Sequence, residues 1–232
     1  MKRRLVFLPF LLLLFQMQTV TAFEAGWTEK KLGKVIIKAD RAARQKNWSR
    51  AIEYGEKVLE GSAALDQESD ARYIGQLQNL NRYYDKANRL SEVADRVKKG
   101  YELATKNLNP RHHTTMMSRT LYYKLHIINK NYRGAIPLVL ENISLAGKGD
   151  QEDYRKLYYL EQLYSLYAIS GQFEKEERVL HQYLELNRQM FGDEDEDSAR
   201  VLLILAQNYC RRKLLDKFKE LTATYGLQYV CY

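Results

Sequence analysis

Hydrophobic and polar positions alternate along the chain with helical spacing, most clearly in residues 160–184. Leu160, Leu163 and Tyr167 fall on one face of a predicted amphipathic helix. Gly171 interrupts this pattern, and glycine ends helices readily because it adopts the left-handed backbone conformation. A second apolar helical face follows and includes Leu180. The segment therefore predicts two helices joined by a tight turn, and such a hairpin needs neighbours to bury both of its apolar faces.

The same pattern recurs along the chain with a nearly constant period. The residues at one equivalent position of the second helix are separated by 42, 42, 41 and 42 residues: Ala51, Val93, Ala135, Glu176 and Phe218. Three positions earlier, each repeat has a large apolar residue: Trp48, Leu90, Tyr132, Phe173 and Leu215. Thirteen positions before the same second-helix residues, four of the repeats have an apolar residue. Only the first repeat departs from this rule, with Lys38. Terminal repeats are expected to be atypical.

A fixed period of this length is typical of a helical repeat array. The sequence therefore predicts an all-α fold, a solenoid of about five helical hairpins over residues 23–226, followed by a short C-terminal tail, residues 227–232. Pro137 falls inside one predicted helix, which we expect it to kink.

The repeats resemble those of the tetratricopeptide repeat (TPR) family. The resemblance depends on the order of large, small, aromatic and turn residues, carried by Leu160, Leu163, Tyr167, Gly171 and Phe173, by Leu202, Leu205, Ala206 and Tyr209, and by Trp48 with Ala51. The period and the segment FGDEDEDSARVLLILAQNY resemble the longer, kinesin-light-chain-type repeats. The resemblance extends from Trp27 to Tyr225, and Glu176 and Phe218 depart from it where the family has alanine. It implies a right-handed solenoid whose concave face, lined by the first helix of each repeat, binds a peptide or a partner helix.

The N-terminus has the features of a secretory signal peptide. Lys2, Arg3 and Arg4 precede an eleven-residue apolar run, and small residues lead up to Ala22. We expect residues 1–22 to be a signal peptide cleaved after Ala22, which would place the protein in the periplasm or outside the cell. The alternative is a membrane anchor, but Pro9 interrupts the run, and spanning a bilayer takes about 20 apolar residues. No other membrane span is expected.

The charge balance disfavours nucleic acid as a partner. The chain has 37 basic and 29 acidic residues, and removing residues 1–22 leaves 34 basic residues, a net charge of +5. The two signs alternate along the chain, whereas nucleic-acid-binding proteins usually carry a basic patch.

No catalytic, cofactor or metal site is predicted. Asp193, Asp195 and Asp197 have the spacing of a calcium loop, but Ser198 and Ile204 occupy the positions that need glycine and glutamate. The four histidines lack the spacing of a metal site. An enzyme would need a convergent cluster of acid, base or nucleophilic groups, and the sequence indicates none.

The two cysteines, Cys210 and Cys231, could form a disulfide in an oxidising compartment. Helix geometry allows the tail to return from Gly226 to Cys210, so the bond is feasible. Two free thiols are the alternative, since free cysteines are often buried. Asn47 and Asn142 match the N-glycosylation pattern, which matters only in a eukaryote.

Helical geometry places several long cationic or polar side chains on the concave face. The candidate partner-binding residues are Arg44, Arg82, Lys86, Lys124, Gln207 and Arg211. Such cations could hold the carboxylates of an acidic segment; alternatively, they form only a solvated surface. The sequence therefore favours a non-catalytic interaction scaffold that binds a protein or peptide in envelope assembly or secretion. The alternative is a structural subunit of an oligomeric envelope complex. Partner, organism and oligomeric state stay open.

Overall fold

The computed structural model describes residues 26–147, 149–192 and 195–231, so the predicted signal peptide, residues 1–22, lies outside the described residues. Within these ranges the chain forms ten α-helices and one short 3₁₀ helix, η1, without any β-strand. The helices are α1 (Glu29–Arg44), α2 (Trp48–Leu65), α3 (Ala71–Lys86), η1 (Leu90–Val93), α4 (Ala94–Asn107), α5 (His113–Ile128), α6 (Tyr132–Leu145), α7 (Asp150–Ile169), α8 (Phe173–Phe191), α9 (Glu196–Arg211) and α10 (Leu215–Tyr225). The all-α fold and its five hairpins are confirmed.

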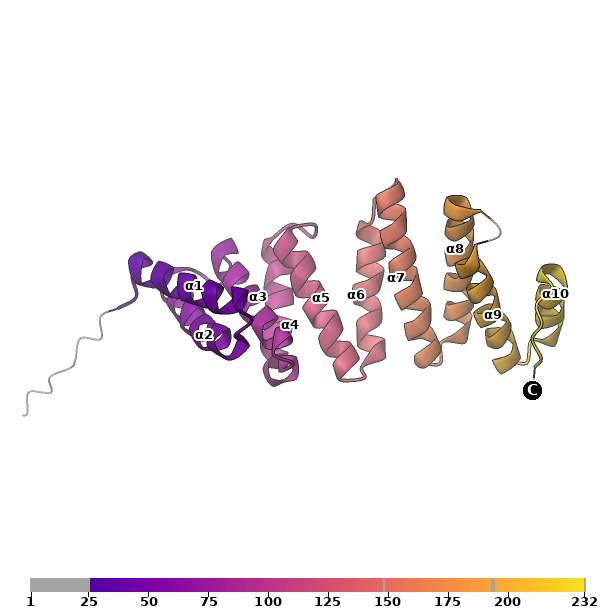
Figure 1. Cartoon of the computed structure of the whole chain (residues 1–232), viewed down its shortest axis with the longest axis horizontal. Coiled ribbons are helices and arrows are strands. Elements are labelled where there is room, and N and C mark those ends of the chain that lie inside the picture. The colour runs from indigo at the N-terminus through magenta and orange to yellow at the C-terminus, as the bar shows by residue number, and fades with distance from the viewer. Residues whose placement is uncertain (1–25, 148, 193–194, 232) are drawn as a thin grey trace, which may run out of the picture.

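The hairpins stack in a row, as Figure 1 shows, with α1 and α10 at opposite ends. Each α-helix packs against the next one in the sequence, both within a hairpin and between successive hairpins. In addition, α3 packs against α5, which are the first helices of adjacent repeats. Pro137 lies inside helix α6, as the sequence predicted, and the helix continues past it to Leu145.

The turn inside each hairpin has the same backbone geometry. Five residues at the turns have φ between 54° and 71°, with the separations of the sequence repeat: Lys46, Asn88, Lys130, Gly171 and Lys213. At each turn the next residue donates its backbone N–H to the carbonyl five positions earlier; for example, Gln172 donates to Tyr167 at 2.8 Å. This hydrogen bond satisfies a carbonyl at the helix C-terminus, as in a Schellman motif. The backbone conformation of the turn is therefore repeated in all five hairpins, although only one of the five positive-φ residues is glycine.

We expect Gly171→Ala to lower the free energy of unfolding by about 1 kcal/mol, because a side chain disfavours the left-handed conformation. The residue has φ 71° and no atom within 4 Å of an added Cβ, so backbone strain alone sets the cost. Gly75→Ala is the matched control: Gly75 lies within helix α3 with equally open space, and alanine there should stabilise by about 0.5–1 kcal/mol. Urea denaturation measures both changes, and equal signs for the two variants would contradict the proposed turn.

The core follows the predicted register, with one exception. At the predicted core positions Leu80, Leu163 and Leu205 are at most 2% exposed, whereas Lys38 of the terminal repeat is exposed. Leu215 occupies the large apolar position at the start of the second helix of its repeat, but it does not fill the core there, since its side chain is 51% exposed. The preceding residue, Leu214, packs against the core instead.

A single ion pair between α5 and α6 contains an almost completely buried arginine. Arg119 is 1% exposed, and its guanidinium donates to Glu141 at 2.5 Å and to Asn142 Oδ1 at 3.0 Å. A third hydrogen bond goes from Arg119 to the backbone carbonyl of Pro110 at 3.2 Å. Glu141 also accepts a hydrogen bond of 2.6 Å from the Tyr101 hydroxyl of α4. These contacts connect three successive helices through one carboxylate.

Candidate binding face

Polar contacts connect the first helices of neighbouring repeats. The Lys124 ammonium of α5 lies 2.6 Å from the Asp85 carboxylate of α3. The Tyr83 hydroxyl of α3 donates to Asp40 of α1 at 3.4 Å. In the C-terminal half, the Arg200 guanidinium of α9 lies 3.1 Å from Glu161 of α7. Helices α1, α3 and α5, and likewise α7 and α9, therefore present a shared polar face, which includes Lys124, one of the six candidate residues.

Three of the six candidate residues gather at the N-terminal end of this face. Arg44 of α1 and Arg82 and Lys86 of α3 line a depression of about 230 Å³, together with Asp40 and Trp48. The Arg82 guanidinium donates to Asn79 Oδ1 at 3.2 Å and lies 5.6 Å from the Tyr83 ring centroid. Arg44 and Lys86 form no ion pair within the described residues. This depression therefore has three cations and one nearby carboxylate.

The other three candidate residues lie elsewhere along the face. Lys124 is already paired with Asp85, whose side chain is only 10% exposed. Arg211 is likewise paired, with Glu176 at 3.1 Å, and its guanidinium lies 5.0 Å from the Phe173 ring centroid. Gln207 is exposed on α9. The continuous row of free cations that the sequence suggested is therefore interrupted by internal ion pairs.

Glu176 is a buried carboxylate that connects α8 to α9. It is 0% exposed, and it accepts hydrogen bonds from Asn208 at 3.0 Å and from Arg211 at 3.1 Å. Asn208 also donates to the Phe173 carbonyl at 2.8 Å. Burial raises the pKa of the Glu176 carboxyl, and the bonds from Asn208 and Arg211 oppose this effect only in part. The sequence marked Glu176 as a departure from alanine, but the spacing alone did not reveal its two partners one repeat later.

Because the pKa of Glu176 is raised in the folded state, the free energy of unfolding depends on pH. Because the folded state favours the protonated carboxyl, its contribution to stability is full below the unfolded pKa and is lost as the pH rises through the folded pKa. We therefore expect Glu176→Gln to gain stability relative to the wild type as the pH increases from 4 to 7. Glu185→Gln, an exposed change on the same helix, is the matched control for the loss of one carboxylate. Urea titrations at several pH values measure both; a Glu176→Gln difference that falls with pH would contradict the prediction.

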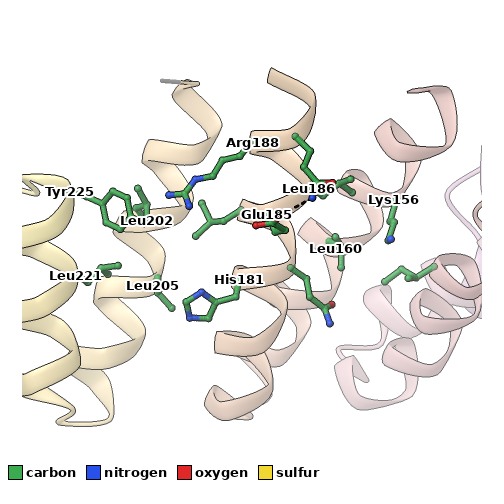
Figure 2. Close-up of a pocket in the computed structure, with 14 residues that line it drawn as sticks. Lys156, Leu160, His181, Glu185, Leu186, Arg188, Leu202, Leu205, Leu221 and Tyr225 are labelled. Atoms are coloured by element: carbon green, nitrogen blue, oxygen red, sulfur yellow. Dashed lines mark hydrogen bonds between the residues drawn. The ribbon is translucent and has the colours of Figure 1, made fainter. Parts of the chain in front are cut away.

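The largest cavity lies around α8 and was not predicted. Its volume is about 730 Å³, and its walls include Leu160, Leu202 and Leu221. Figure 2 shows Tyr225 and Leu221 on one side of α8, and Lys156 and Leu160 on the other. None of the six candidate residues lines this cavity. Two of its polar side chains bind each other, through the 2.6 Å hydrogen bond that Gln189 donates to Glu185.

The structure joins Cys210 and Cys231, with an S–S distance of 2.01 Å and a Cα–Cα distance of 5.5 Å. The tail between α10 and Cys231 packs Leu227 and Tyr229 against the C-terminal core. The Tyr229 ring lies 6.1 Å from that of Phe218. The tail therefore folds back to α9 and covers apolar surface at the end of the solenoid.

The described part of the chain has no group of three or more acidic, histidine or cysteine side chains arranged to hold a metal ion. Asp195, in the aspartate run that leads into α9, caps this helix and accepts from the backbone N–H groups of Asp197 and Ser198. None of the described helices is both long and apolar enough to span a bilayer.

Comparison with solved structures identifies the fold. The chain resembles a Podosopora anserina protein described as kinesin light chain with nearly identical TPR-like repeats, at a TM-score of 0.60 and 18% identity, covering 83% of this chain and 92% of the other. BtubC (BKLC) of P. vanneervenii aligns at a TM-score of 0.52 and 13% identity, covering 87% of this chain and 83% of the other. No family model and no curated protein matches the sequence. The chain therefore has a TPR-like repeat fold, as the sequence predicted.

Proposed function

We propose that this protein is a non-catalytic scaffold that binds an acidic peptide or helix on the face formed by α1, α3 and α5. The TPR-like fold supports an interaction scaffold in general. The observation that carries the finer proposal is the depression in which Arg44, Arg82 and Lys86 converge beside the partly buried Trp48. Arg44 and Lys86 have no internal carboxylate partner within the described residues, so they can pair with carboxylates of a ligand. Trp48 adds an apolar surface next to them.

The binding test compares two variants that lose the same charge. In Arg44→Ala/Lys86→Ala one arginine and one lysine are removed from the depression. In Lys106→Ala/Arg133→Ala the same residue types are removed from other exposed positions. A fluorescent acidic peptide, such as a short glutamate-rich sequence, serves as the probe. We expect at least a tenfold loss of affinity for the first variant only, and weaker wild-type binding as salt increases. Equal affinity of wild type and the first variant would place binding elsewhere.

The proposed location is the periplasm or the extracellular space, with a role in envelope assembly or secretion. It depends on the predicted signal peptide and predicts an exported chain that begins at Phe23 and contains the Cys210–Cys231 bond. Intact mass measured without reductant reports both features in one experiment, because the bond removes two hydrogens. Residues 1–22 still attached would contradict the cleavage, and a mass two hydrogens heavier would contradict the bond.

A structural subunit of an oligomeric envelope complex is the second candidate. Several large apolar side chains are exposed, including Ile169 at 60% and Tyr158 at 58% on α7. Light scattering over a range of concentrations distinguishes the two functions, since a scaffold monomer keeps a constant mass whereas a self-assembling subunit does not.

A further inference from the structure

Helix α1 carries much more positive charge than the rest of the chain. It contains six cations against two acids, Glu29 and Asp40, which gives the helix a net charge of +4. Residues 23–232 together have a net charge of +5, so the rest of that chain is close to neutral. The positive excess of the protein is therefore concentrated in its first helix, at one end of the solenoid (Figure 1).

Most of these cations lie on one solvent-exposed stripe. With about 100° between successive residues of a helix, Lys30, Lys34, Lys38 and Arg41 fall within one sector of about 100°, which also contains Ile37. We call these five residues the α1 basic stripe. All five are exposed, and Ile37 is 56% exposed. The two acids of the helix lie on other faces.

The cations of the stripe have no carboxylate partners within the described residues. Lys38 contacts only the face of the Tyr54 ring, with its ammonium 5.7 Å from the centroid. The two acids of α1 point to groups outside the stripe: Glu29 binds Arg72 at 2.8 Å, and Asp40 accepts from Tyr83. The positive charge of the stripe is therefore not neutralised by the fold.

Solvation of the solenoid end explains only part of this pattern. In the later repeats the position equivalent to Lys38 is apolar and belongs to the packed interior: Leu80, Tyr122, Leu163 and Leu205. The first repeat needs polar residues at this position, because its outer side faces water. Charges of either sign would satisfy that requirement, so it does not explain why the stripe is positive. It also does not explain why Ile37 is exposed among the cations.

We propose that the α1 basic stripe docks the protein on the surface of an anionic phospholipid bilayer. Clustered lysines and arginines near the bilayer surface are attracted to anionic headgroups. Ile37, an aliphatic side chain at one edge of the stripe, can enter the boundary between headgroups and acyl chains. Nucleic acid would use the cations but would gain little from Ile37, so the combination favours lipid.

The experiment uses vesicle flotation with the chain that begins at Phe23, which contains all the described helices. Vesicles are made of phosphatidylcholine alone or with about 30% phosphatidylglycerol. The test variant replaces Lys30, Lys34, Lys38 and Arg41 with glutamine. The control variant replaces Lys106, Lys130, Arg133 and Lys219, which are exposed and again comprise three lysines and one arginine. Circular dichroism checks that both variants keep the helical content of the wild type, since glutamine and lysine have similar helix propensities.

We expect the wild type and the control variant to float only with anionic vesicles and to be released as salt rises. The test variant should bind at least tenfold more weakly than the control, and Ile37→Ser should weaken binding at least threefold. Equal losses in the test and control variants would overturn the proposal, because binding would then follow net charge alone. It would also be overturned by a wild type that binds neither vesicle, or that binds a DNA oligonucleotide more tightly than anionic vesicles.

Discussion

Glu141→Gln should lower the free energy of unfolding by about 3 kcal/mol, although the two side chains have the same shape. The reason is Arg119, which is 1% exposed and has Glu141 as its ion-pair partner. Without that carboxylate the guanidinium stays buried without a compensating charge, which is the costly way to break a buried ion pair. The glutamine can still accept one hydrogen bond, from Arg119 or from Tyr101, so the loss should fall at the lower end of the usual range.

Two controls separate this effect from ordinary surface electrostatics. Arg119→Met/Glu141→Gln removes both charges and should recover most of the lost stability, because a buried ion pair can often be replaced by apolar groups. Glu92→Gln breaks an exposed pair with Arg89 and should cost far less than Glu141→Gln, because exposed ion pairs contribute little to stability. Urea denaturation at neutral pH measures all three variants. If Glu141→Gln unfolds like the wild type, the buried ion pair does not exist as the structure shows it.

The architecture was predictable because its signal is repeated. Each hairpin needs the same apolar positions, so a nearly constant spacing appears even where single repeats match the TPR pattern poorly. The turns illustrate how much of this signal is positional. Gly171 was recognised from its residue type, whereas Lys130 and Lys213 adopt the same positive φ with no local sequence signal. Only their distance from neighbouring repeats could have identified them.

The side-chain pairs were much less predictable. Helical spacing put Arg44, Arg82 and Lys86 on one predicted face, because the direction of a side chain follows from its position in the repeat, and in the structure these three side chains line one depression. Spacing does not indicate whether an acid on the adjacent helix is close enough to pair, which depends on helix crossing and side-chain length. For this reason the sequence treated Lys124 and Arg211 as free cations, although the structure pairs them with Asp85 and Glu176. The buried Arg119 was missed for the same reason.

Tyr167→Ala is expected to lower the free energy of unfolding by about 3–4 kcal/mol, the usual cost of truncating a packed aromatic side chain. Tyr167 is 7% exposed and belongs to the core cluster that extends from α6 to α10. Its ring also has the Lys175 ammonium 5.6 Å from its centroid, so the substitution removes a contact across the turn between α7 and α8. Thermal and urea unfolding measure the loss.

Tyr158→Ala provides the matched comparison for the repeat register, because it is the same substitution on the same helix. Tyr158 is 58% exposed, and changes at such surface positions usually stay within about 0.5 kcal/mol. The register places Tyr167 at a packed position of its repeat, and the structure agrees, so the two variants should differ by at least about 2 kcal/mol. Circular dichroism at low temperature should show native helical content for both, which ties the difference to packing rather than to helix propensity. Variants of equal stability would mean that α7 presents a different face to the core.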